Sequence, residues 1–249
     1  MSAPVEVLNP EGRGRVVLLC EHASNRIPAA YDGLGLTEPD SLSHAAWDPG
    51  ALSLGLHLSG TLDAPLVAST VSRLVYDCNR PPKAAAAMPE RSELIEVPGN
   101  AGLSQAERAA RTRAVYDPFC SAVSQVLDAR GARSVVVTVH SFTPVFFGQP
   151  RAVELGLLHD EDTRLADAML DYADRIPHRR VERNQPYGPA DGVTHSLRVH
   201  ALRRGLANVM IEVRNDLLQN EEQIAAMAGD IMALLQPALK DITNEEDVS

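Results

Sequence analysis

The apolar residues of this chain fall into short runs that alternate with longer amphipathic stretches. Residues 15–19 (RVVLL) and 134–139 (SVVVTV) are almost continuously apolar and rich in β-branched side chains, which is typical of buried strands. Weaker runs of the same kind predict further strands at residues 65–70, 152–158, 179–183 and 207–213.

Helices are predicted in the stretches between these strands. Residues 104–107 (SQAE) have the Ser-x-x-Glu pattern of a capping box, and apolar residues keep a helical spacing from there until Gly131. Four more helices are predicted at residues 51–62, 162–173, 194–204 and 221–235. Because strands separated by helices favour parallel pairing, we predict an α/β fold of three layers, α/β/α, with a mostly parallel sheet.

The length of 249 residues suits one large α/β domain, and no segment of the chain reads as a linker. We therefore expect a single domain over residues 1–249, with loose ends at about 1–12 and 241–249. Residues 83–102 mix alanine, proline, glycine and charges without a clear period. They are predicted to form an exposed excursion that could act as a flap over a site.

Composition narrows the choice of partner and compartment. The chain has 23 Lys and Arg against 33 Asp and Glu, a net charge of −10, which argues against nucleic acid or an anionic membrane as partner. No stretch reads as a signal peptide or a membrane span, so we expect a cytoplasmic protein. Cys20, Cys78 and Cys120 form no Cys-x-x-Cys pair, so neither a disulfide framework nor a zinc knuckle is expected.

Polar side chains that can bind a metal or transfer a proton stand at the ends of three apolar runs. His22, His140 and Glu212 each follow or end such a run, and the carboxyl ends of parallel strands meet at one edge of a sheet. With Asp48 they make up the residues of an open zinc site, in which three ligands leave one position for water and a nearby carboxylate moves a proton. The alternatives from the residues alone are histidines satisfied by packing and a Glu212 paired with Arg214.

Five sequence blocks resemble the N-formylglutamate amidohydrolase family, in family order, between about Arg15 and Leu235. The blocks are residues 21–28 (EHASNRIP), 44–51 (HAAWDPGA), 72–81 (SRLVYDCNRP), 139–144 (VHSFTP) and 211–217 (IEVRNDL). The resemblance implies a mixed α/β sheet similar to that of zinc carboxypeptidases. It also implies one zinc ion and the hydrolysis of N-formyl-L-glutamate to formate and L-glutamate.

The resemblance gives the strand-end residues their roles. His22 corresponds to the first zinc ligand of the carboxypeptidase His-x-x-Glu motif, and His140 corresponds to the later zinc histidine. Glu212 corresponds to the general base, which would accept a proton from a metal-activated water.

The chain departs from that motif at the second ligand, where Asn25 stands in place of the glutamate. An amide is a poor zinc ligand, so we expect Asp48 to replace it. Glu21 is the other option, although its side chain should point away from that of His22 if the strand continues through both.

Substrate-binding candidates also follow from the resemblance. Asn79 and Arg80 are similar to the pair that binds a substrate α-carboxylate, and a guanidinium suits that planar anion. Arg73 is a candidate for polarising the scissile carbonyl or for holding a second carboxylate. His195, on a predicted helix, is a further candidate for substrate binding, with simple packing as its alternative. The side chains that would select glutamate are not identified, and three arginines stay unranked: Arg151, Arg183 and Arg198.

Two other readings of the function stay open. The first is a different N-acyl amino acid amidase, or a small peptidase, on the same scaffold. The second is a noncatalytic relative that binds a metal or a ligand. A serine hydrolase is not expected, because the chain has no Gly-x-Ser-x-Gly element.

Overall fold

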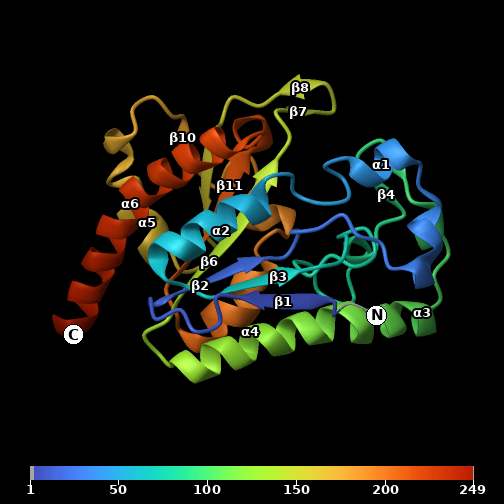
Figure 1. The fold of residues 1–249 in the computed structure, drawn as a ribbon, viewed down its shortest axis with the longest axis horizontal. Helices are drawn as coiled ribbons and strands as arrows, with labels where there is room; N and C mark the ends of the chain where they lie inside the picture. The colour runs from blue at the N-terminus through green and yellow to red at the C-terminus, as the bar shows by residue number, and fades with distance from the viewer. Residues whose placement is uncertain (1–2, 249) are drawn as a thin grey trace.

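The computed structural model describes residues 3–248, and a seven-stranded sheet runs through this part of the chain (Figure 1). Strands β3, β2, β6 and β11 are parallel neighbours, β1 and β9 flank them in antiparallel orientation, and β10 is parallel to β9. The predicted mostly parallel sheet is thus confirmed, and it is mixed. In spatial order the strands are β1 Val5–Leu8, β3 Leu66–Ser69, β2 Val16–Cys20, β6 Val135–Phe142, β11 Asn208–Arg214, β9 Leu155–Leu158 and β10 Val181–Arg183.

Helices cover both faces of the sheet, which confirms the three-layer arrangement (Figure 1). One face carries α2 (Ala51–Leu62), α5 (Arg164–Leu170) and α6 (Glu221–Val248), and the other carries α4 (Asp117–Arg130). Two shorter helices, α1 (Glu38–Leu42) and α3 (Gln105–Arg111), lie outside these layers.

The pleat of β2 divides the apolar core into two halves. Leu18 packs into the core on the side of α2 and α6, whereas Val17 and Leu19 pack on the side of α4, against residues such as Phe119. Successive side chains of a strand point to opposite faces, so a strand buried on both faces needs an unbroken apolar run. This requirement explains the run that the sequence shows at residues 16–20.

Local sequence signals set the ends of the helical segment at residues 105–130. Ser104 accepts from the N–H of Glu107, whose carboxylate accepts from the N–H of Ser104, so the predicted capping box is confirmed. Gly131, at a φ of 82°, follows the last residue of α4, as expected. Between α3 and α4 the backbone forms one wide π turn, Thr112–Tyr116.

Both chain ends differ from the prediction. Val5–Leu8 forms the edge strand β1 rather than a loose lead-in, because it pairs with β3 along its whole length. The last helix, α6, continues to Val248 rather than ending at Leu235, so residues 241–248 are helical. Residues 1–2 and 249 lie outside the described residues.

Residues 83–102 are folded onto the body rather than exposed along their length. They contain the short hairpin of β4 (Arg91–Ser92) and β5 (Ile95–Glu96). The side chain of Asn100 is buried and donates to the carbonyls of Leu74 and Pro89. The bond to Leu74 ties the segment to the loop that follows β3. The expectation of an exposed excursion therefore holds for about half of these residues, and buried contacts hold the others against the body.

The loops at the carboxyl ends of the central strands gather at one edge of the sheet. They include residues 21–28 after β2, residues 70–82 after β3 and a second hairpin after β6, formed by β7 (Val145–Phe146) and β8 (Gln149–Pro150). Among the described residues, no helix combines the length and apolar character needed to cross a membrane.

Candidate metal site and substrate pocket

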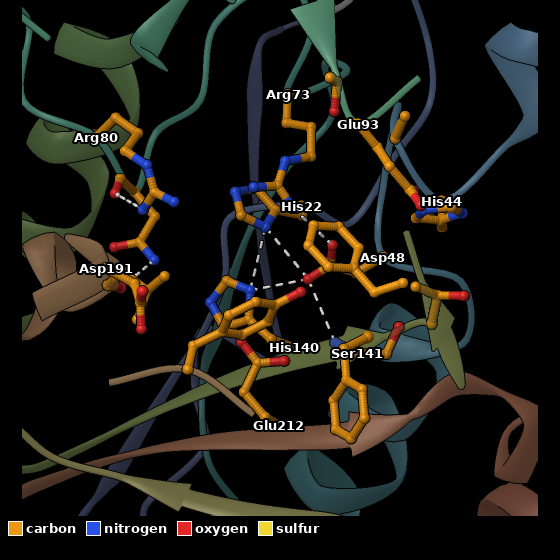
Figure 2. A pocket seen from close by; sticks show the side chains of 18 residues that line it. His22, His44, Asp48, Arg73, Arg80, Glu93, His140, Ser141, Asp191 and Glu212 are labelled. Atoms are coloured by element: carbon orange, nitrogen blue, oxygen red, sulfur yellow. Dashed lines mark hydrogen bonds and ion pairs between the residues drawn. The ribbon is translucent and has the colours of Figure 1, made fainter. Parts of the chain in front are cut away.

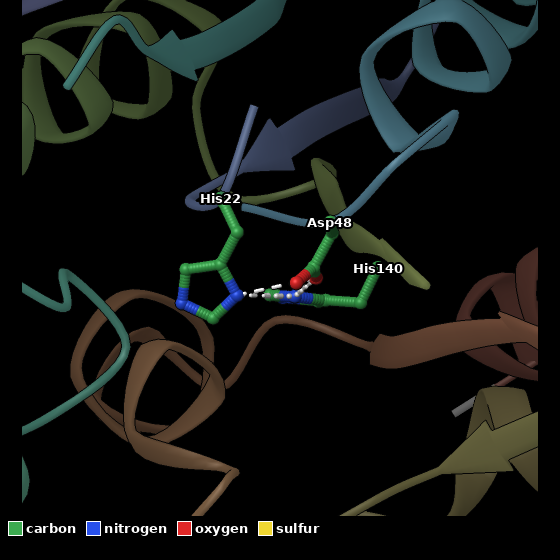
Figure 3. Close-up of side chains that lie close together, drawn as sticks. All are labelled: His22, Asp48 and His140. Atoms are coloured by element: carbon green, nitrogen blue, oxygen red, sulfur yellow. Dashed lines mark hydrogen bonds and ion pairs between the residues drawn. The ribbon is translucent and has the colours of Figure 1, made fainter. Parts of the chain in front are cut away.

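Three side chains from separate parts of the chain converge at this edge (Figure 3). His22 follows β2, Asp48 precedes α2, and His140 lies within β6. Nδ1 of His140 is 3.1 Å from Nδ1 of His22 and 2.9 Å from Oδ2 of Asp48, and Nδ1 of His22 is 3.2 Å from the same oxygen. All three residues are buried. We call them the His–Asp–His cluster.

Two further carboxylates contact the outer nitrogens of the histidines. Oδ1 of Asp77 is 2.7 Å from Nε2 of His22, and Oε2 of Glu21 is 3.2 Å from Nε2 of His140. A carboxylate at Nε2 favours the tautomer with its proton on that atom, which leaves the lone pair on Nδ1. The Nδ1 atoms of both histidines face each other and Asp48, and in this tautomer each offers a lone pair to a cation between them.

The His–Asp–His cluster fits a zinc ion by its donor atoms and their spacing. Two imidazole nitrogens and one carboxylate oxygen converge, and a cation between them would satisfy all three lone pairs. A tetrahedral zinc holds its ligand atoms about 3.3 Å apart, close to the 2.9–3.2 Å found here. Each histidine also has the carboxylate partner that metal-bound histidines commonly have.

Three buried carboxylates in and beside the cluster, those of Asp48, Asp77 and Glu21, differ from Glu212 in their charge state. Burial acts to raise the pKa of Asp48 and Asp77, but His22 and Arg73 outweigh it and hold both pKa values below the usual range. Burial likewise opposes the charge of Glu21, and His140 lowers its pKa. These three groups are ionised at neutral pH.

Glu212 has the opposite shift. It stands beside His140 because the two residues pair in register on the parallel strands β11 and β6. Its side chain is buried, one carboxylate oxygen has no hydrogen-bond partner among the described residues, and burial raises the pKa to about 7. The partner considered from sequence, Arg214, instead contacts Asp216 and Glu154. Glu212 is thus the carboxyl group at this site that can exchange a proton near neutral pH.

Arg73 joins two of the carboxylates. Its Nη1 is 3.1 Å from Oδ1 of Asp48, and its Nη2 is 3.0 Å from Oδ2 of Asp77. The guanidinium therefore braces the cluster from the side of the pocket, and its two terminal nitrogens are already engaged by carboxylates.

A pocket of about 360 Å³ opens above the cluster. Figure 2 shows Arg80 and Asp191 on one side of it and His44 and Glu93 on the other, with the cluster between them. The remaining lining residues come from the strand ends and their loops: Ala45, Arg73, Asn79, Ser92, Ser141, Phe142, Thr143, Phe146, Tyr187, Val193 and Glu212.

Asn79 and Arg80 both line the pocket, and their contacts differ. The amide of Asn79 donates to the carbonyl of Val193 and accepts from the N–H of Ser196, so it fixes the segment that follows Gly192. Arg80 uses Nη1 for the carbonyls of Asn79 and Gly192. Its Nε and Nη2 have no hydrogen bond to any described residue, so the guanidinium has donors available for an anion in the pocket.

The other residues considered from sequence are not among those that line the pocket. His195 contacts the hydroxyl of Tyr116, and burial lowers its pKa. Asn25 donates to the carbonyl of Ser41, outside the His–Asp–His cluster. Of the three unranked arginines, Arg151 packs against three rings that line the pocket, those of Phe142, Phe146 and Tyr187. Arg183 pairs with Asp167 and Arg198 pairs with Asp160.

Three residues that contact the cluster or line the pocket were not among the candidates predicted from the sequence. Asp77 contacts Nε2 of His22 and the guanidinium of Arg73. Glu93 lies within the segment that was predicted to be an exposed excursion, and Tyr187 lies in a loop without a motif. Asp77 had one usable signal, its position four residues after Arg73, which suits a local ion pair. The other two had none, since long-range folding alone brings them to the pocket.

The fold and the site define a three-layer α/β protein with a pocket and a candidate metal-binding triad at the carboxyl ends of its parallel strands. A comparison with sequence models of protein families identifies the family: the model for N-formylglutamate amidohydrolase matches residues 14–219. The chain therefore belongs to the N-formylglutamate amidohydrolase family, and the expected family is confirmed.

Two solved structures have the same fold. The gene product Atu2144 from Agrobacterium tumefaciens is 53% identical in sequence, with 97% of each chain covered and a TM-score of 0.94. The N-formylglutamate amidohydrolase from Ralstonia eutropha JMP134 is 20% identical, with 95% of this chain and 97% of that chain covered and a TM-score of 0.69. A search of curated proteins gave no match to this chain.

Proposed function

We propose that this protein is a zinc-dependent amidohydrolase that cleaves the amide bond of an N-acyl amino acid, with N-formyl-L-glutamate as the first candidate substrate. The observation that carries the proposal is the convergence of His22, Asp48 and His140 beside Glu212 in the floor of the pocket. Membership of the amidohydrolase family supports the reaction type.

The metal would be held by Nδ1 of His22, Nδ1 of His140 and Oδ2 of Asp48, whose lone pairs converge. A bound zinc ion supplies a Lewis acid for the amide carbonyl and lowers the pKa of a water molecule. Asp77 and Glu21 would hold the two histidine rings in the required tautomer.

Glu212 would move the protons. Its carboxylate accepts a proton from the water that attacks the amide carbon. The same carboxyl group then gives a proton to the nitrogen as the carbon–nitrogen bond breaks, which releases the acid and the free amino acid. A pKa raised by burial to about 7 suits both halves of this transfer.

Arg80 would hold the α-carboxylate of the substrate with its available guanidinium nitrogens. Asn79 supports that position through the backbone at Val193 and Ser196. For Arg73, the contacts with Asp48 and Asp77 favour bracing of the cluster. Direct polarisation of the scissile carbonyl by Arg73 stays a prediction.

The test is a substrate panel on purified protein of known metal content. The panel contains N-formyl, N-acetyl and N-succinyl derivatives of glutamate, other N-formyl amino acids and simple dipeptides. We expect release of the amino acid from N-formyl-L-glutamate, with about one zinc per chain. Turnover of dipeptides alone would indicate a peptidase, and metal binding without turnover of any compound would indicate a noncatalytic relative.

A further inference from the structure

His44 and Glu93 form a pair in the pocket wall that takes no part in the His–Asp–His cluster. His44 lies in the loop between α1 and α2, and Glu93 lies in the turn between β4 and β5. Nε2 of His44 is 2.8 Å from Oε2 of Glu93, and both residues line the pocket. Figure 2 shows the pair on the side of the pocket opposite Arg80.

Two loops hold Glu93 in place. Its Oε2 contacts His44, and its Oε1 accepts from the backbone N–H of Phe147, in the turn between β7 and β8. The side chain of Glu93 is 16% exposed and that of His44 is 36% exposed, so the imidazole is the more accessible member of the pair. Nδ1 of His44 has no hydrogen-bond partner among the described residues.

A substrate with two carboxylates needs two anion-binding groups in the pocket. Arg80 is one of them. The single positive charge of Arg73 already faces two carboxylates, Asp48 and Asp77. The two histidines of the cluster turn Nδ1 toward each other and Asp48. Of the basic side chains that line the pocket, His44 is the one left for a second anion.

We propose that His44, held by Glu93, binds the side-chain carboxylate of an N-acyl acidic amino acid whose α-carboxylate is bound by Arg80. The inference rests on the proposed function, because it assigns the specificity of the same site. The Glu93 carboxylate at Nε2 orients the ring. In its imidazolium form, His44 donates Nδ1–H to the substrate carboxylate as a charge-assisted hydrogen bond. Glu93 is a positioning residue in this scheme, because it acts through His44.

The experiment compares N-formyl-L-glutamate with N-formyl-L-glutamine, which is nearly the same shape but lacks the second charge. The ratio of the two kcat/KM values is measured for the zinc-loaded wild type and for His44→Gln and Glu93→Gln. The matched control is His57→Gln, because His57 forms a similar pair with Glu221 on the surface, at 2.6 Å. The dissociation constants of L-glutamate and L-glutamine, measured by calorimetry on the same proteins, report on binding without turnover.

We expect the wild type to prefer the glutamate compound. His44→Gln should lower the ratio about 10-fold to 100-fold, the range for a hydrogen bond to a charged group. Glu93→Gln should lower it in the same direction by a smaller factor, and His57→Gln should leave it unchanged. Thermal unfolding of each variant shows whether the protein is folded.

The inference is overturned if His44→Gln leaves the ratio unchanged. It is also overturned if Glu93→Gln raises the preference for glutamate, since the Glu93 carboxylate would then repel the substrate. If the wild type cleaves none of the N-acyl amino acids in the panel, the proposed function fails. The binding data then decide the inference alone, and equal affinity for L-glutamate and L-glutamine overturns it.

Discussion

At the scale of single residues, the partners of each buried carboxylate decide what it can do. Asp77 and Glu21 face histidine nitrogens and are ionised, so they can orient the rings but cannot shuttle a proton near neutral pH. Glu212 lacks such a partner on one oxygen, and burial raises its pKa to about 7. The site thus contains two carboxylates that stay ionised near neutral pH and one that can exchange a proton there.

The first prediction concerns Glu212. Because Glu212 is expected to transfer protons and not to hold the metal, Glu212→Gln should lower kcat on the true substrate by about 10²-fold to 10⁴-fold. The zinc content should stay unchanged. Steady-state kinetics together with metal analysis make the check, and a variant that kept full rate with zinc bound would disprove the assignment.

The second prediction concerns Asp77. Asp77→Asn keeps the shape of the side chain but removes the charge that faces Nε2 of His22, so zinc should bind about 10-fold or more weakly. Competition with a chelator measures the affinity. Glu221→Gln is the control, because it makes the same change at the surface histidine His57. Equal zinc affinity in Asp77→Asn and wild type would remove Asp77 from the metal site.

The sequence placed the central residues of the site and missed their partners. His22, His140 and Glu212 could be found because each follows or ends a buried apolar run, and parallel strands bring such ends together. Asp77 meets His22 from 55 positions away, between loops whose path no local pattern encodes. No local pattern encodes the position of Glu93 opposite Arg80 either.

At the scale of elements, prediction succeeded where one local signal decides the structure. The apolar run of β6 and the capping box at Ser104 are signals of this kind, and both are confirmed. It failed for β1, which is stabilised by pairing with β3, and for the buried part of residues 83–102, which is held by contacts such as those of Asn100. Tertiary contacts decide those segments.

The third prediction concerns the approach of β9 to the loop that carries Tyr187. A Cβ atom at Gly156 would lie 1.9 Å from the carbonyl oxygen of Gln185, so the loop could not keep its position. Gly156→Ala should therefore destabilise the protein by about 1–3 kcal/mol and raise KM. Urea unfolding and kinetics give the two readouts.

Gly229 provides the matched control for this change. It lies on the exposed side of α6, and an added Cβ would meet no atom within 4 Å. Gly229→Ala should stabilise the protein by about 0.5–1 kcal/mol, because alanine favours the helix interior. If Gly156→Ala behaved like Gly229→Ala, the close approach of β9 to the loop at Gln185 would matter neither for stability nor for KM.

At the scale of the whole molecule, the parallel arrangement of β3, β2, β6 and β11 explains why the site exists where it does. These strands deliver loops from distant parts of the chain to one edge, where the cluster, Glu212 and the pocket meet (Figures 1 and 2). The net charge of −10 does not by itself attract an acidic substrate. Anion binding must therefore come from individual groups such as Arg80.

The central claim is that the cluster holds a zinc ion needed for amide hydrolysis, and metal removal tests it most directly. Formate release from N-formyl-L-glutamate is measured for chelator-treated protein before and after titration with zinc. The account predicts that hydrolysis is lost on treatment and returns as zinc approaches one equivalent per chain. A metal-free protein that hydrolyses the substrate at the full rate would contradict it.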